Sequence, residues 1–259
     1  MKSLLIAFAM YSKIPVPQVE WDKKSLSWAL CWFPVVGVVI GVVLALWLWI
    51  ADMLSLTALR AAGAVAIPML LSGAIHLDGF CDTCDALSSH QSRERKLEIL
   101  KDSHTGAFAI ICCCLYLLLF YAVWREVKTE GIDLIFLCLA PALSRCFSGL
   151  AAVSWPNARG SGLLATFTQP MDAKKARVVL ILAILVLIGA MTALAADAGI
   201  YYPLALPGAA LLTFLYYRLM AMKQFGGITG DTAGFFVQVC ECAMVLAMVL
   251  GQRIWEVAA

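Results

Sequence analysis

The segment at residues 76–87 has the sequence His-Leu-Asp-Gly-Phe-Cys-Asp-Thr-Cys-Asp-Ala-Leu, which concentrates acidic side chains. In a helix, Asp78, Asp82 and Asp85 occupy positions i, i+4 and i+7, so they share one face. Carboxylates this close repel one another, and a bound cation relieves the repulsion. Because oxygen ligands suit hard cations, we predict a site for Mg²⁺, Mn²⁺ or Ca²⁺, with Mg²⁺ as the expected cofactor. The alternative is a solvated acidic helix face.

The same segment supplies the candidate catalytic residues. Asp78 and Asp82 are expected to act in catalysis, and His76 is expected to bind substrate. The pair Cys81-x-x-Cys84 would, on its own, suggest zinc or redox chemistry. These two positions point partly away from the aspartates, and no second Cys pair in the chain has a matching spacing. We therefore expect the two thiols to take no part in the metal site.

A second polar segment, Lys-Asp-Ser-His-Thr-Gly at residues 101–106, stands where a long apolar stretch begins. Asp102 offers a fourth carboxylate to the predicted metal. Lys101 and Ser103, together with the free N–H groups of a helix start, are expected to bind a phosphate. The alternative is an ordinary capped helix start at the membrane interface.

A third segment, residues 226–234, has the sequence Gly-Gly-Ile-Thr-Gly-Asp-Thr-Ala-Gly. Glycines let a backbone approach a phosphate closely, and Thr229 and Asp231 add oxygen ligands. We expect these two residues to bind substrate, together with Lys223 just before them. The alternative is a glycine-rich turn at the membrane surface.

Two charged residues, Arg145 and Glu241, lie inside apolar stretches. Charges within a membrane are costly and usually face the interior of a helix bundle or a cavity. We expect Arg145 to point into the same cavity as the aspartates and to bind a substrate phosphate. The alternative is a purely structural ion pair between Arg145 and Glu241.

The elements that must position these residues are apolar helices. Of the 259 residues, 63% are hydrophobic and 14% are charged, whereas soluble domains carry about 25% charged residues. Seven stretches approach the ~20 residues needed to cross a lipid bilayer. We predict an all-α, polytopic transmembrane helical bundle, a single domain over residues 1–259, in which residues 1–11 form a retained amphipathic or re-entrant segment. The expected spans are residues 28–50, 61–75, 106–124, 134–153, 178–196, 200–220 and 235–253.

The distribution of the 19 Lys and Arg residues predicts the orientation in the membrane. With a cytoplasmic N-terminus, the positive charges on the opposite side are few, which agrees with the positive-inside rule. They are Arg60, Arg125, Lys128 and Arg253. The long polar segments then all face the cytoplasm, an asymmetry more typical of an enzyme with cytoplasmic substrates than of a pore. The chain has no basic block, so nucleic acid is not expected as a partner.

Together these motifs resemble those of the cobalamin synthase family, whose members are also named adenosylcobinamide-GDP ribazoletransferases. The resemblance rests on His-Leu-Asp-Gly-x-x-Asp-Thr-x-Asp at 76–85, Lys-Asp-Ser-x-x-Gly at 101–106, Ser-Arg at 144–145 and Gly-Gly-x-Thr-Gly-Asp-Thr at 226–232, with Ile14-Pro15-Val16-Pro17 and Gly162-Leu163-Leu164 in support. Ala86, His104 and Ala109 depart from the Gly, Arg and Gly that the family tends to have.

The resemblance implies a late step of cobalamin biosynthesis in the bacterial inner membrane. Such an enzyme joins adenosylcobinamide-GDP to α-ribazole, or to its 5′-phosphate, and releases GMP with the help of Mg²⁺.

Other classes stay open: a membrane phosphotransferase acting on a CDP-alcohol or prenyl diphosphate, and a cation transporter. A transporter would need its carboxylates near the bilayer midplane, whereas the aspartates named above lie at predicted span ends. The sequence also leaves a homo-oligomer open. If the aspartates form one site, the second, third and seventh spans must pack together.

Overall fold

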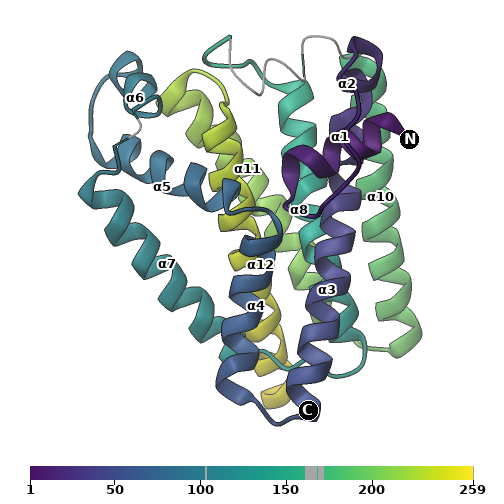
Figure 1. Ribbon diagram of the computed structural model, residues 1–259. Coiled ribbons are helices and arrows are strands. Elements are labelled where there is room, and N and C mark those ends of the chain that lie inside the picture. Colours follow the sequence, from purple (N-terminus) through teal and green to yellow (C-terminus); the bar gives the residue numbers. More distant parts are fainter. Residues whose placement is uncertain (103, 161–167, 169–171, 259) are drawn as a thin grey trace.

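A computed structural model describes residues 1–102, 104–160, 168 and 172–258. Within these residues the chain folds into helices and forms no strand, apart from an isolated β-bridge (Figure 1). The helices are α1 (Lys2–Tyr11), α2 (Lys23–Ala29), η1 (Leu30–Trp32), α3 (Phe33–Met53), α4 (Thr57–Leu71), α5 (Ile75–Ser88), α6 (Arg93–Ile99), α7 (Ala107–Glu126), α8 (Ile132–Ser154), α10 (Ala173–Ala198), η2 (Tyr202–Leu204), α11 (Ala205–Phe225) and α12 (Gly230–Ala258). Ser103 and the Gly-Leu-Leu motif at 162–164 lie outside the described residues.

The described helices include six segments that are long and apolar enough to cross a membrane. They are Lys23–Met53, Ala107–Glu126, Ile132–Ser154, Ala173–Ala198, Tyr202–Phe225 and Gly230–Ala258. α4 and α5, which meet at an angle of 93°, make a seventh crossing when they are counted as one broken span. The prediction of a polytopic all-α bundle with about seven spans is confirmed.

The second span was predicted as one helix over residues 61–75. The structure instead has a helix that ends before residue 75 and a second helix that begins there. α4 ends at Leu71, and Gly73 and Ala74 adopt positive φ angles of 65° and 59°. The Ala74 N–H donates to the Met69 carbonyl at 2.7 Å, so this backbone group is satisfied within the bend. As a result, α5 runs across the bundle instead of along it, and it carries the acidic motif with it (Figure 1).

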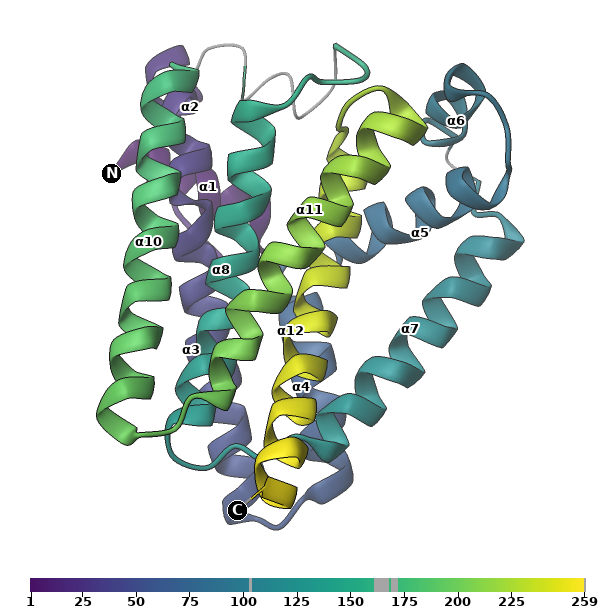
Figure 2. The same cartoon turned by 180° about the vertical axis from the view of Figure 1, so that it is seen from behind.

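Small residues allow the helices of the bundle to approach closely. Gly37 and Gly41 of α3 face α8, and a Cβ atom at Gly37 would lie 2.6 Å from the Cα of Ala142. Lipid gives helices little hydrophobic reason to associate, so such close packing supplies the contact energy instead. α12 packs against α5, α7, α8 and α11 (Figure 2), and this places its N-terminal turn among the polar segments.

The outer surface and the two ends of the bundle fit a multi-pass membrane protein. Apolar side chains such as Val186 and Leu219 are about 70% exposed on the outside of the bundle, which suits lipid rather than water. The N-terminus, α2 and α6 lie at one end, and the C-terminus lies at the other (Figure 1). An odd number of crossings requires this separation of the termini.

A buried ion pair links α8 to α12. Arg145 Nη1 lies 2.7 Å from Glu241 Oε1 and donates to the Pro141 carbonyl at 2.8 Å. The Ser144 hydroxyl donates to the same Glu241 oxygen at 2.9 Å. The Arg145 side chain is 1% exposed, so removing Glu241 alone would leave a positive charge uncompensated in the interior.

We expect Glu241→Met to lower the stability of the fold by ~3–5 kcal/mol, because it strands the Arg145 charge. The double variant Arg145→Met with Glu241→Met should be more stable than the single variant, since it removes both charges. Thermal unfolding of the detergent-solubilised protein measures the difference. Glu126→Met, which breaks an exposed pair with Arg253, is the control and should leave the unfolding temperature nearly unchanged. A double variant no more stable than Glu241→Met would contradict this explanation.

Candidate functional site

The central contact of the site is the crossing of α5 over the start of α12. A Cβ atom at Gly79 would lie 2.6 Å from the Asp231 carbonyl oxygen, and one at Gly234 would lie 3.0 Å from the His76 carbonyl oxygen. A side chain at Gly79 would therefore push the two backbones apart. α5 also packs against α7, so the expected packing of the second, third and seventh spans is confirmed.

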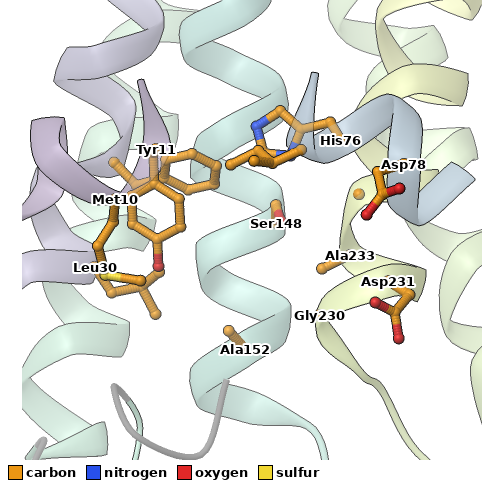
Figure 3. A pocket seen from close by; sticks show the side chains of 13 residues that line it. Met10, Tyr11, Leu30, His76, Asp78, Ser148, Ala152, Gly230, Asp231 and Ala233 are labelled. Carbon is orange, nitrogen blue, oxygen red and sulfur yellow. The ribbon is translucent and has the colours of Figure 1, made fainter. Parts of the chain in front are cut away.

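This crossing gathers carboxylates from distant parts of the chain. Asp78 and Asp231 line the same cavity, and Figure 3 shows their side chains near one another on one of its walls. Asp82 follows Asp78 by one turn of α5, and its carboxylate is within electrostatic reach of Asp78, Asp231, Asp85 and Arg159. Asp78 and Asp231 therefore lie at the same end of the bundle, as a composite site requires.

These carboxylates are suitable ligands for Mg²⁺, although the protein side chains do not form a complete set of metal ligands. Across the part of the chain that the structure describes, no three His, Cys, Asp or Glu side chains converge as a metal-binding group. Mg²⁺ is usually held by one or two carboxylates together with substrate phosphates. An incomplete set of carboxylate ligands therefore fits a Mg²⁺ ion that binds together with the substrate of the protein. The assignment of Mg²⁺ stays a prediction.

Asp85 has partners of its own at the start of α7. Its carboxylate accepts the Gly106 N–H at 2.6 Å and the Ala109 N–H at 2.8 Å. Free N–H groups at a helix start are stabilised by such a negative charge. A Cβ atom at Gly106 would collide with this carboxylate, so the glycine keeps the contact open. The structure thus shows Asp85 joining α5 to α7, and its role as a metal ligand stays a prediction.

Arg159 is a site residue that the sequence analysis missed. Its Nη2 atom lies 2.9 Å from Asp231 Oδ2. The backbone brings the two together, because Ala158 N–H donates to the Ile228 carbonyl and Ile228 N–H donates to the Pro156 carbonyl, both at 2.9 Å. The loop after α8 is thereby fixed to the loop before α12. No spacing in the sequence indicates this contact, since it depends on a bridge between two irregular segments.

Thr229 caps the start of α12. Its N–H donates to Thr232 Oγ1 at 2.9 Å, and the Thr232 N–H donates back to Thr229 Oγ1 at 3.1 Å. The Thr229 hydroxyl also lies 3.4 Å from Asp231 Oδ2, so it helps to orient that carboxylate. Lys223 is exposed at the end of α11, where its carbonyl accepts from Arg93 Nε at 3.2 Å. The substrate-binding roles of Thr229 and Lys223 stay predictions.

The segment before α7 is the most solvent-exposed of the predicted site segments. Asp102 Oδ1 accepts the His104 N–H at 3.0 Å and lies 2.7 Å from His104 Nδ1. The hydrogen bonds from the His104 backbone and ring hold the pKa of Asp102 below its usual range. Lys101 is exposed, and Ser103 lies outside the described residues. Asp102 is therefore paired with His104, and the predicted metal and phosphate roles of this segment stay predictions.

Arg145 does not line the cavity, contrary to the expectation. Its guanidinium is held by Glu241 inside the bundle, and the Phe33 ring, which does line the cavity, lies 5.6 Å from the guanidinium carbon. The structure thus shows the ion pair between Arg145 and Glu241, and the expected binding of a substrate phosphate by Arg145 stays a prediction.

A cavity of about 260 Å³ lies beside the carboxylates (Figure 3). Its acidic wall contains Asp78 and Asp231, and the wall formed by α1, η1 and α3 is apolar apart from the Tyr11 hydroxyl. The side chains of that wall are Met10, Tyr11, Leu30 and Phe33. The cavity thus joins a cluster of charges to an apolar recess.

Comparison with known proteins extends over nearly the whole chain. Residues 3–249 match the family model described as cobalamin-5-phosphate synthase. A protein of Lachnoclostridium phytofermentans named adenosylcobinamide-GDP ribazoletransferase is 41% identical over 255 residues, which cover 98% of this chain and 95% of the relative. Proteins of the same name from Clostridium perfringens and Pseudomonas entomophila are 34% and 35% identical, each covering 95% of this chain and 97% of the relative.

No solved structure matches the chain. The family match includes every segment that contributes to the cavity, from α1 to the first turns of α12. The resemblance seen in the motifs is therefore confirmed, and the chain belongs to the cobalamin-5-phosphate synthase family.

Proposed function

We propose that this chain is a membrane transferase that joins adenosylcobinamide-GDP to α-ribazole, or to α-ribazole 5′-phosphate, with release of GMP. Support comes from its family and from relatives named adenosylcobinamide-GDP ribazoletransferase that match almost its whole length. The main structural support is that Asp78 and Asp231 line one cavity, with Arg159 paired to Asp231 and Asp82 within electrostatic reach of all three. Carboxylates for a divalent cation and a guanidinium for phosphate are the groups that a reaction on a diphosphate needs.

In the proposed reaction, a ribose hydroxyl of the acceptor attacks the phosphorus atom nearer to cobinamide. A new P–O bond forms, the bond to GMP breaks, and GMP leaves with the bonding electron pair. The hydroxyl proton passes to a base, and charge builds up on the transferring phosphoryl oxygens while the attacking and leaving oxygens lie in line. The protein must therefore hold two substrates in line and stabilise negative charge.

The residues around the cavity divide these tasks. Asp78 and Asp82 would hold Mg²⁺ together with oxygens of the diphosphate. The bound ion would neutralise phosphate charge and orient the leaving group. Arg159 would bind a phosphate oxygen through its guanidinium, and its pair with Asp231 keeps it in position. The contacts of Asp85 with Gly106 and Ala109 would hold α5 and α7 at a fixed distance.

We also place the protein in the bacterial inner membrane, with the cavity at the cytoplasmic end. The positive-inside rule supports this orientation, because few Lys and Arg residues lie at the end of the bundle opposite the N-terminus. Both substrates are polar, so an opening to the cytoplasm gives them access without crossing lipid.

Asp78→Asn and Asp82→Asn are expected to lower the rate of GMP release at least ~100-fold, since each removes a carboxylate that would hold the Mg²⁺ ion against the diphosphate. The assay measures GMP released from adenosylcobinamide-GDP in the presence of α-ribazole. Asp197→Asn changes an exposed aspartate near the end of α10 and should leave the rate unchanged. Near-normal turnover by membrane-inserted Asp82→Asn would remove the metal assignment.

Removal of divalent cations with a chelator should abolish GMP release, and added Mg²⁺ should restore it, because the protein carboxylates need the ion to bind the diphosphate. Residual activity in Asp82→Asn should need a higher Mg²⁺ concentration for half-maximal rate than the wild type. Full activity after exhaustive chelation would show that the carboxylates serve another purpose.

Reporter fusions test the orientation. Alkaline phosphatase, which is active only outside the cytoplasm, should be active at the C-terminus and inactive when fused after Gln91, between α5 and α6. Green fluorescent protein should give the opposite pattern at both positions. An active phosphatase at Gln91 would reverse the proposed orientation.

A further inference from the structure

The cavity beside the carboxylates contains a buried polar atom that has no hydrogen-bond partner among the described residues. His76 is 6% exposed, and its Nε2 atom makes no hydrogen bond to any described residue. Figure 3 shows the His76 ring near Ser148, between the Tyr11 ring and Asp78. The Phe33 ring lies 5.8 Å from the imidazole. An unpaired buried nitrogen is unfavourable, so a bound ligand that satisfies it gains a hydrogen bond without displacing another.

The size of the cavity limits which part of a substrate it can hold. Its volume of about 260 Å³ lies below the ~300–1,000 Å³ that pockets for whole drug-sized ligands occupy. A corrinoid is far larger than this, so only a fragment of adenosylcobinamide-GDP would fit. The nucleoside acceptor is the smaller of the two substrates and matches the space better.

The polarity of the cavity walls indicates which of two aromatic bases fits the cavity better, the guanine of adenosylcobinamide-GDP or the benzimidazole of α-ribazole. Guanine carries a carbonyl, an amino group and ring N–H groups, all of which need partners when they are buried. Met10, Leu30 and Phe33 supply apolar contact instead, and the polar group on their wall is the Tyr11 hydroxyl. The dimethylated benzimidazole of α-ribazole is an apolar bicycle with a single unsubstituted ring nitrogen, so one donor satisfies it.

We propose that this cavity is the acceptor subsite and that it binds a benzimidazole-type base, with His76 Nε2–H donating to the free ring nitrogen. The inference rests on the proposed function, and it identifies where the acceptor binds. Met10, Leu30 and Phe33 contact the faces and edge of the base. The attached ribose then points toward Asp78 and Asp231 on the opposite wall, where the hydroxyl meets the diphosphate.

The first test uses the wild-type protein and two acceptors, α-ribazole and an analogue in which a C–H replaces the free ring nitrogen. The analogue should raise KM for the acceptor about tenfold, since it leaves His76 Nε2 unpaired. His76→Phe keeps a ring of similar shape and should raise KM for α-ribazole to the same degree, while it leaves KM for adenosylcobinamide-GDP unchanged. For His76→Phe, the two acceptors should have equal KM values, because the interaction that distinguishes them is gone.

The second test fills the recess. Ala152 lines the cavity on α8, and Ala152→Leu should raise KM for α-ribazole at least about tenfold by occupying the space of the base. Ala190→Leu makes the same change at an exposed position on α10 and should have no effect. Membrane insertion of each variant is checked by its yield and by its elution as a single species in detergent.

The experimental outcomes distinguish a failure of the proposed acceptor subsite from a failure of the proposed function. Absence of GMP release from adenosylcobinamide-GDP with any acceptor would overturn the proposed function itself. GMP release with equal wild-type KM values for α-ribazole and the C–H analogue would overturn the subsite and leave the proposed function standing. A rise in KM for adenosylcobinamide-GDP instead of the acceptor in Ala152→Leu would assign the cavity to the other substrate. The wild-type comparison decides the matter even if a variant fails to insert.

Discussion

The close crossing of α5 over the first turn of α12 is the constraint on which the rest of the site depends. It exists only because Gly79 and Gly234 carry no side chain at the points where the two backbones meet. The crossing sets Asp78 beside Asp231, although the two belong to segments far apart in the chain. It also fixes the position of Arg159, because that residue is held against Asp231. A side chain at Gly79 would push the Asp231 backbone away and would thereby displace both the Asp231 carboxylate and Arg159.

The break between α4 and α5 makes this crossing possible. A straight helix through residues 61–88 would carry the acidic motif along the bundle axis, whereas the turn at Gly73 and Ala74 lays it across the axis. Ala74 is an L-residue in the left-handed region, a conformation that is uncommon outside Gly, Asn and Asp. Irregular backbone within a membrane protein is tolerated where it is buried in protein or lines a cavity. The hydrogen bond from Ala74 to Met69 and the cavity beside His76 meet this condition.

The sequence predicted what depends on periodicity and failed where the fold joins distant irregular segments. The apolar stretches gave the spans, and the spacing of Asp78 and Asp82 put them on one helix face, because both signals are local. The contacts of Asp85 with the start of α7 could not be derived in this way, and for Arg145 the sequence left the choice between a cavity position and an ion pair open. Asp85 binds backbone N–H groups of another helix, and Arg145 is engaged by Glu241. Arg159 was missed because its contact with Asp231 depends on a backbone bridge between two loops.

The arrangement of the cavity also bears on a problem that any transferase of this kind faces, which is the presence of water. Water competes with the acceptor hydroxyl for the same phosphorus atom, and excluding it prevents loss of the activated substrate by hydrolysis. The apolar wall of Met10, Leu30 and Phe33 stands across the cavity from the charges of Asp78 and Asp231. An acceptor base that fills this recess would displace water from the side where the nucleophile approaches. The charged wall would meanwhile retain the groups that bind the diphosphate. A helix bundle can provide both environments within one cavity, and this offers a physical reason for embedding a reaction between polar substrates in a membrane protein.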